Sequence, residues 1–66
     1  MPILQIHLVA GRSDTIKAEL VAELTRTVQR VLGSDPDRIQ ILLSEYGDGH
    51  WSKGGKALKL RGGTIS

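Results

Sequence analysis

Residues 3–32, ILQIHLVAGRSDTIKAELVAELTRTVQRVL, carry the strongest fold signal in the sequence, because the spacing of their apolar side chains changes once. Over residues 3–9, apolar side chains stand at every second position, which is the period of a β-strand. Over residues 14–32 they recur every three or four positions, which marks one face of an α-helix. The sequence therefore predicts a strand followed by a helix. The apolar positions are Leu4, Ile6 and Leu8 in the strand and Ile16, Leu20, Leu24, Val28 and Val31 in the helix.

Outward from this stretch, residues 33–45 predict the end of the helix and a second strand. Gly33 tolerates the left-handed backbone that ends many helices, and Pro36 disfavours helical backbone in the residue before it. Alternation of apolar side chains returns from about Arg38 to Glu45, so we expect the second strand there. The order strand, helix, strand forms a βαβ unit whose right-handed crossover makes the strands parallel. The expected fold class is thus α/β, built on a single βαβ unit.

The chain after residue 45 is rich in glycine and has no long apolar pattern. Gly54-Gly55 suits the tight turn of a short C-terminal hairpin, and residues 57–66 are expected to form a loosely ordered tail. The whole chain, residues 1–66, is short enough for one domain only. We therefore expect a single domain in which the hairpin follows the βαβ unit.

One helix covers one face of a two-stranded sheet, so the opposite face is left for partners. A domain of 66 residues rarely gains more than roughly 3–5 kcal/mol from its core, and disulfides, metals or partners usually supply the rest. The chain has no cysteine and its two histidines lack further ligands nearby, so no disulfide, metal or cofactor is expected. Oligomerisation is therefore the expected source of the additional stability. The open face is expected to carry Ile3, Val9 and Leu42 beside Gln5, His7, Gln40 and Ser44.

Charge and hydropathy argue against a membrane or nucleic-acid function. No apolar run approaches the roughly 20 residues of a membrane span, and the first residues lack the layout of a signal peptide, so a cytoplasmic location is expected. The net charge is only +2, although basic side chains gather near the carboxy terminus. Only Tyr46 and Trp51 offer aromatic rings for stacking, and no known binding motif occurs, so no nucleic-acid partner is expected.

Pro2 is the first residue with potential chemistry. Removal of Met1 leaves the proline nitrogen as a secondary amine at the edge of a strand. An ordinary α-amino group has a pKa of about 7.7–8.0, and an apolar pocket or a nearby cation would lower the pKa of the proline amine towards neutrality. Such an amine is a competent general base. If Met1 stays attached, the nitrogen is a tertiary amide and cannot act as a base. Proline is common at this position, so Pro2 alone does not establish catalysis.

Arg12 lies between the expected strand and the expected helix, beside the helix N-terminus. Its planar guanidinium suits a carboxylate, and the helix dipole adds positive potential nearby. An exposed loop arginine without a ligand fits the same pattern. Both interpretations of Arg12 stay open on the residues alone.

Four segments together resemble the 4-oxalocrotonate tautomerase family: PILQIHL at residues 2–8, GRSD at residues 11–14, the SDP turn at residues 34–36, and GHW at residues 49–51. A glycine pair at residues 54–55 follows at the family's spacing. The most specific elements are the proline start and the Gly-Arg-Ser at that distance from it. The resemblance covers most of the chain.

The resemblance implies an isomerase, an intramolecular oxidoreductase that interconverts keto and enol groups of a small-molecule carboxylic acid. It implies that Pro2 moves a proton between oxygen and carbon of a 2-hydroxy-dienoate or 2-oxo acid, and that Arg12 binds the substrate carboxylate. Trp51 stands where the family usually has phenylalanine, so it is either an apolar wall of the site or an anchor between subunits. The implied assembly is a homohexamer, a trimer of dimers.

One position departs from the family pattern. Gln40 stands where the family has a second catalytic arginine, and it brings a hydrogen-bond donor without a charge. Loss of a charged donor of this kind typically costs about 2.7–4 kcal/mol of transition-state stabilisation. Arg38, on the same expected strand face about 6–7 Å away, is a candidate substitute in binding substrate. The departure argues against activity on the family's dicarboxylate. The alternative function is a non-catalytic tautomerase-like subunit, paired with a catalytic partner chain.

Overall fold

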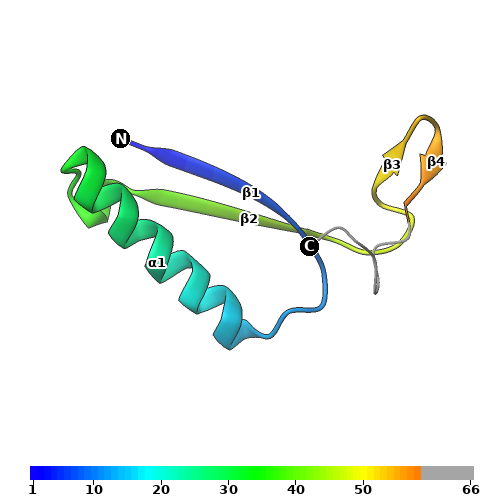
Figure 1. The fold of residues 1–66 in the computed structure, drawn as a ribbon, viewed down its shortest axis with the longest axis horizontal. Helices are drawn as coiled ribbons and strands as arrows, with labels where there is room; N and C mark the ends of the chain where they lie inside the picture. The colour runs from blue at the N-terminus through cyan, green and yellow to red at the C-terminus, as the bar shows by residue number, and fades with distance from the viewer. Residues whose placement is uncertain (59–66) are drawn as a thin grey trace.

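A parallel two-stranded sheet with one long helix on one side forms the body of the protein (Figure 1). The computed structural model describes residues 1–58. In register, Ile3 lies opposite Gln40 and Val9 lies opposite Tyr46. The α/β fold class, with its βαβ unit and short C-terminal hairpin, is confirmed. The elements are β1 (Ile3–Val9), α1 (Asp14–Leu32), the 3-10 helix η1 (Pro36–Arg38), β2 (Gln40–Tyr46), β3 (Ser52–Lys53) and β4 (Lys56–Ala57).

Both ends of α1 are capped by local sequence. The Ser13 hydroxyl accepts a hydrogen bond from the backbone N–H of Ile16 at 3.2 Å, which satisfies one of the free donors in the first turn. At the other end Gly33 has φ 69°, a left-handed conformation, and its N–H donates to the Gln29 carbonyl at 2.9 Å. These two contacts explain why the helix occupies the predicted residues.

The second strand begins two residues later than the alternation of side chains predicts. The Asp35 side chain accepts a hydrogen bond from the Asp37 N–H at 3.0 Å, and the Arg38 N–H donates to the Asp35 carbonyl at 2.9 Å. These bonds fold residues 36–38 into η1, and β2 starts only at Gln40. The prediction that Arg38 shares a strand face with Gln40 is therefore wrong. The strand also ends one residue later than expected, at Tyr46.

The apolar stripe of α1 is covered only along its middle. Leu20, Leu24 and Val28 are half-buried, whereas Ile16 and Val31 are 55% and 64% exposed. A helix of 19 residues is about 28 Å long, and a strand of seven is about 23 Å long. The helix is therefore longer than the sheet, and the side chains at both ends of its apolar stripe stay exposed.

The sheet face away from α1 is open at one end and covered at the other. Ile3 and Leu42 are 56% and 48% exposed, as expected for an uncovered face. Val9 was expected beside them, but it is buried, with 8% of its surface exposed. Tyr46 lies opposite Val9 in the register, and its ring packs edge-on against Trp51 from the segment after β2, so aromatic side chains gather at this end of the sheet.

The C-terminal segment forms the expected hairpin. Strands β3 and β4 pair antiparallel around Gly54 and Gly55, whose φ angles of 62° and 81° suit glycine. The hairpin lies beyond the carboxyl end of β2 (Figure 1). The loose tail was predicted over residues 57–66, but Ala57 belongs to β4. The remainder of that prediction, residues 59–66, lies outside the described residues.

Candidate functional site

The predicted base and the predicted amide donor lie together at the N-terminal end of the sheet. The backbone N–H of Gln40 donates to the Pro2 carbonyl at 3.0 Å. Pro2 comes directly before β1 and is half-buried, and Gln40 is the first residue of β2 and is exposed. Parallel strands begin at the same end of a sheet, which is why residues so far apart in sequence meet here.

Arg12 lies in the loop between β1 and α1, at the opposite end of the sheet. One guanidinium nitrogen, Nη1, donates to the Val9 carbonyl at 2.8 Å, so the side chain folds back over the strand that precedes it. The guanidinium has five N–H donors, and this bond uses one of them. Arg12 is half-buried, and the bond to the Val9 carbonyl defines the position of its side chain.

An ion-pair cluster fixes the start of α1 beside this loop. Lys17 Nζ lies 2.8 Å from Glu45 Oε1 and 3.5 Å from Asp14 Oδ1. The hydrogen bond to Glu45 and the two negative charges raise the pKa of Lys17 above its ordinary value. Because Lys17 holds the Glu45 carboxylate, that carboxylate is engaged away from Arg12. The guanidinium of Arg12 is then available to an external anion.

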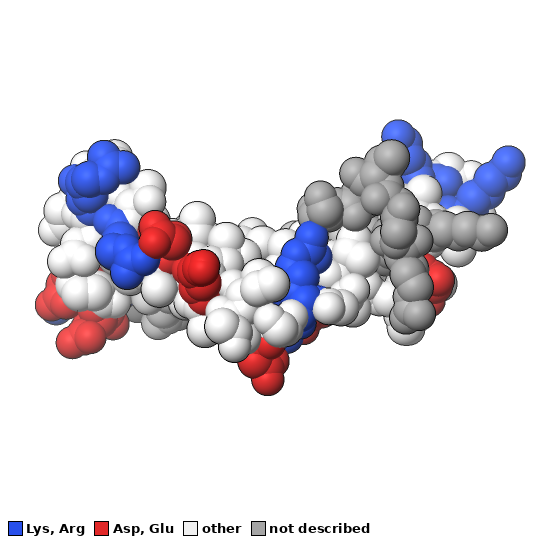
Figure 2. Space-filling model, turned by 60° about the horizontal axis from the view of Figure 1, so that its bottom comes forward, with Lys and Arg blue, Asp and Glu red and all other residues white. Residues whose placement is uncertain are grey.

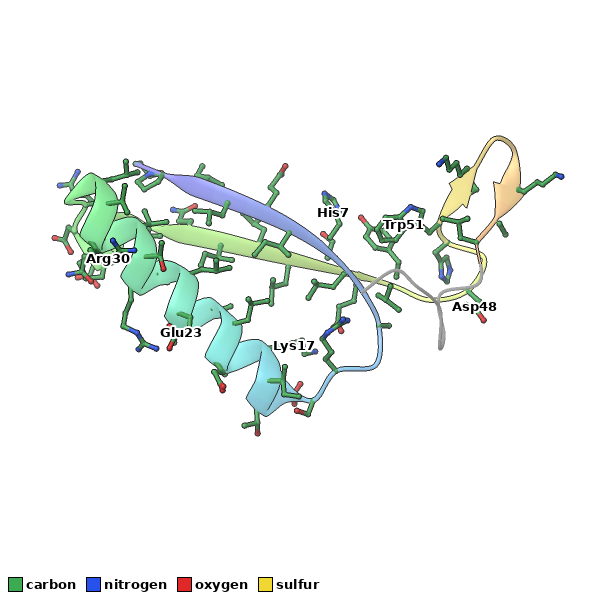
Figure 3. The ribbon with its side chains drawn as sticks, viewed as in Figure 1. His7, Lys17, Glu23, Arg30, Asp48 and Trp51 are labelled. Carbon is green, nitrogen blue, oxygen red and sulfur yellow. The ribbon has the colours of Figure 1, made fainter. Side chains whose placement is uncertain are left out.

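Trp51 lies at the same end of the sheet as Arg12, on the side away from α1 (Figure 3). Its ring meets Tyr46 edge-on, with centroids 5.4 Å apart and an interplanar angle of 72°. Its carbonyl accepts a hydrogen bond from the Leu58 N–H at 2.7 Å. The Tyr46 hydroxyl in turn forms a 2.8 Å hydrogen bond with His7 Nδ1. Tyr46 was not among the predicted site residues, because the second strand was expected to end at Glu45; in the observed register Tyr46 lies on the same sheet face as His7.

The candidate residues thus form two groups at opposite ends of one sheet. The N-terminus lies at one end of β1 and the β3–β4 hairpin beyond the other (Figure 1). A strand of seven residues separates Pro2 from Arg12, a span on the order of 20 Å. No small acid bridges that distance. Within one chain, Pro2 therefore lies a strand length away from Arg12 and Trp51.

Other polar features of the described chain suggest no further site. A shallow depression on the outer surface of α1 mixes both signs of charge, and Arg26 and Glu23 form an ion pair within it. Figure 2 likewise shows acidic and basic side chains interspersed, with no field of one sign on that face. Among residues 1–58, no three His, Cys, Asp or Glu side chains gather as metal ligands. Within the same residues, no helix has the length and apolar character to cross a membrane.

Comparisons with known proteins agree with this architecture. The family model described as tautomerase enzyme matches residues 2–61. A 2-hydroxymuconate tautomerase of Pseudomonas putida is 37% identical over 62 residues, covering 92% of this chain and 98% of the relative. A structure of 4-oxalocrotonate tautomerase isozymes from Methylibium petroleiphilum superposes with a TM-score of 0.76 at 39% identity, covering 85% of this chain and 88% of that one.

A third similar structure is a heterohexameric 4-oxalocrotonate tautomerase from Chloroflexus aurantiacus, with a TM-score of 0.74 and 28% identity, covering 86% of this chain and 92% of that one. The resemblance noted in the sequence is confirmed by these matches. They span nearly the whole chain and nearly the whole of each relative. The chain therefore belongs to the tautomerase family of enzymes.

Proposed function

We propose that the protein is an isomerase that interconverts the enol and keto forms of a small 2-oxo monocarboxylic acid. The site would combine Pro2 and Gln40 of one subunit with Arg12 and Trp51 of another. The observation that carries this proposal is the separation of the two groups by the length of β1. Neither group alone holds both a base and a carboxylate-binding cation, and two copies of the chain supply both.

The free Pro2 amine would act as the base once Met1 is removed. It takes the proton from the enol hydroxyl while the oxygen becomes a carbonyl, and the electron pair of the carbon–carbon double bond takes a proton back from the ammonium. The net result is one proton moved from oxygen to carbon. The positive charge of Arg12 and the apolar surface of Trp51 from the other subunit would both lower the pKa of the amine, because each disfavours its charged form.

The proposed substrate class follows from the number of cations. The fork of Arg12 suits one carboxylate. Gln40, held beside Pro2 by its backbone hydrogen bond, would donate from its side-chain amide to the carbonyl or enolate oxygen. Arg38 lies on η1 and not on β2, so it does not restore a charge at the strand position of Gln40. One guanidinium and one neutral amide favour a monocarboxylate over a dicarboxylate.

The open apolar surfaces support assembly. Ile3 and Leu42 on the sheet face, and Ile16 and Val31 at the ends of the helix stripe, have about half or more of their surface exposed. Burial of such side chains stabilises association by roughly 25 cal/mol per Å². We propose a hexamer, a trimer of dimers, and the hexameric relative from Chloroflexus agrees with this number. Light scattering measures the assembly, and a stable monomer at micromolar concentration would contradict it.

A subunit-mixing experiment tests the shared site. Chains blocked by an uncleaved extension before Pro2 are unfolded and refolded together with Arg12→Ala chains, and turnover of phenylenolpyruvate is compared with each parent alone. In a random mixture about a quarter of the sites would pair a free Pro2 with an intact Arg12. Recovery of activity above the sum of the parents is expected. No recovery in mixed assemblies, verified by native mass spectrometry, would show that Pro2 and Arg12 do not cooperate across subunits.

The second candidate function is a non-catalytic subunit that pairs with a catalytic tautomerase chain. Gln40 in place of an arginine favours it, and the relative from Chloroflexus is itself a heterohexamer. The intact mass of the native protein separates the two candidates. A mass that lacks Met1 frees the Pro2 amine and supports catalysis, whereas retained Met1 leaves an amide nitrogen and supports the non-catalytic role.

A further inference from the structure

Three aromatic rings from three segments form a continuous row on the sheet face away from α1. His7 belongs to β1, Tyr46 ends β2, and Trp51 lies in the segment before β3. The rings of His7 and Tyr46 are stacked, with centroids 5.7 Å apart and an interplanar angle of 26°. The rings of Tyr46 and Trp51 meet edge-on at 5.4 Å. Figure 3 shows His7 and Trp51 on the same side of the sheet.

The parallel register explains the row. His7 pairs with Ser44 and Val9 pairs with Tyr46, so His7 and Tyr46 are diagonal neighbours on one face. Aromatic side chains reach each other across such a diagonal. The 2.8 Å hydrogen bond between His7 Nδ1 and the Tyr46 hydroxyl fixes the position of the outer end of the tyrosine side chain, and the stacking of the two rings restricts rotation of the tyrosine ring about its own axis. A neutral imidazole can accept or donate this bond, and a charged one can donate it, so the bond is available in either state.

The backbone and the indole of Trp51 are held by different contacts. Trp51 lies outside the strands β2 and β3, and its carbonyl oxygen accepts a hydrogen bond from the Leu58 N–H. That bond acts on the backbone and does not set the side-chain angles of the indole. The edge-on contact with Tyr46 is what orients the ring, because the positive edge of one aromatic ring is attracted to the negative face of another.

We infer that Tyr46 is a positioning residue for Trp51, and that His7 holds Tyr46 in the orientation that makes this possible. The inference rests on the proposed function, in which Trp51 forms an apolar wall of the site. Tyr46 itself touches no substrate in this arrangement. It acts by keeping the indole at one angle, so that the wall is already formed when the substrate arrives.

Fluorescence gives a test that does not depend on activity, because the chain has one tryptophan and one tyrosine. In the assembled protein, Tyr46→Leu should shift the Trp51 emission and increase its quenching by acrylamide. Tyr46→Phe keeps the ring and loses only the hydroxyl, so it should produce a smaller change in the same direction. If Tyr46→Leu fails to assemble, Tyr46→Phe decides the result.

The kinetic readout separates positioning from general damage. At a pH high enough for the Pro2 amine to be fully unprotonated in every variant, Tyr46→Leu should raise KM for phenylenolpyruvate about 2- to 12-fold, the equivalent of one lost aromatic pair, and leave kcat nearly unchanged. A wall that contacts ground state and transition state alike contributes to both equally, so its loss raises KM without lowering kcat. A fall in kcat at unchanged KM would overturn the inference.

Variants of β1 complete the test. His7→Leu should change the Trp51 emission and KM as Tyr46→Phe does. His7→Asn places an amide near the position of Nδ1, so its emission and KM should stay close to those of wild type. Gln5→Leu is the matched control, since it adds the same side chain to the same strand face outside the row, and it should leave both readouts unchanged. Unaltered emission and KM in Tyr46→Phe and His7→Leu would overturn the inference. Absence of turnover in wild type with a free Pro2 would instead overturn the proposed function, and the fluorescence result would stand.

Discussion

The two ends of the sheet are built in different ways. At the N-terminal end, Pro2 and Gln40 are joined by one backbone hydrogen bond, and their side chains have no described partners across the strands. At the carboxyl end, Val9 is buried beneath contacts that involve Arg12, Tyr46 and Trp51. The described contacts at the N-terminal end are between backbone atoms, whereas those at the carboxyl end also involve side chains that contact one another.

In the proposed site, the two groups therefore depend on assembly to different degrees. The group around Arg12 is formed within one chain, because Lys17 secures the start of α1 and Tyr46 orients Trp51. At the other end Pro2 is half-buried and Gln40 is exposed, so a second subunit would have to supply the other walls of a pocket there. Changes at one end of the sheet should therefore have different consequences from changes at the other.

The largest expected effect comes from blocking the amine at the open end. An uncleaved extension before Pro2 converts its nitrogen to an amide, and kcat/KM for an enol substrate should fall by about 10²–10⁴-fold, the usual contribution of a general base. Pro2→Ala leaves a primary amine and should retain a fraction of the activity. Steady-state kinetics on variants of verified mass measures both. Full activity with Met1 still attached would refute the role of Pro2.

The next effect concerns the preformed end. Arg12→Ala should raise KM for an acidic enol about 10- to 100-fold, because a hydrogen bond between charged groups contributes about 1.5–3 kcal/mol. Arg12→Lys keeps the positive charge but loses the planar, two-pronged donor geometry of the guanidinium, so its KM should lie between that of wild type and that of Arg12→Ala. Circular dichroism checks that the loop and helix persist. An unchanged KM in a folded Arg12→Ala protein would remove this residue from the site.

A positive charge added at the N-terminal end of the sheet tests whether the neutral Gln40 limits the range of substrates. Gln40→Arg should raise kcat/KM for the dicarboxylate 2-hydroxymuconate by up to about 100-fold, since it adds a charged donor beside Pro2. Gln40→Met has a similar shape and no donor, and it should lower kcat/KM for every enol tested. If the well-folded arginine variant shows no increase, the missing charge is not what limits dicarboxylate turnover.

The smallest effect is on stability at high pH. The pKa of Lys17 is raised in the folded state by Glu45 and Asp14, so its ion pairs stabilise the fold fully below the ordinary lysine pKa. This stabilisation is lost as pH rises through the higher, folded pKa. The difference in urea midpoint between wild type and Lys17→Gln should therefore shrink at strongly alkaline pH. A difference that stays constant with pH would show that the pairs contribute nothing.

Apolar periodicity was enough to predict β1 and α1, and Ser13 and Gly33 mark the ends of the helix because they act locally. The glycine pair predicted the hairpin for the same reason. The start of β2 was mispredicted because the Asp35 side chain captures the backbone of residue 37, and alternation of apolar residues does not register such a bond. Burial of Val9 was missed for a related reason, because alternation does not register tertiary contacts such as the one between Tyr46 and Trp51 at that end of the sheet.

The separation of Pro2 from Arg12 was within reach of the sequence. Parallel strands start at one end, so a residue before β1 and a residue after β1 must lie a strand length apart. The resemblance supplied the roles of Pro2 and Arg12 without that constraint, and the structure adds it. The orientation of Tyr46 towards His7 needed the actual register, because a shift by one residue would turn the ring to the other face.

In the proposed assembly, a site split between chains would make catalysis a property of concentration. A lone subunit would carry both halves of the site but could not join them, so specific activity should decline on dilution once the protein concentration falls below the dissociation constant of the assembly. The same arrangement would let a related chain with a different residue at position 40 enter the assembly and change its substrate range, without any mutation in this chain.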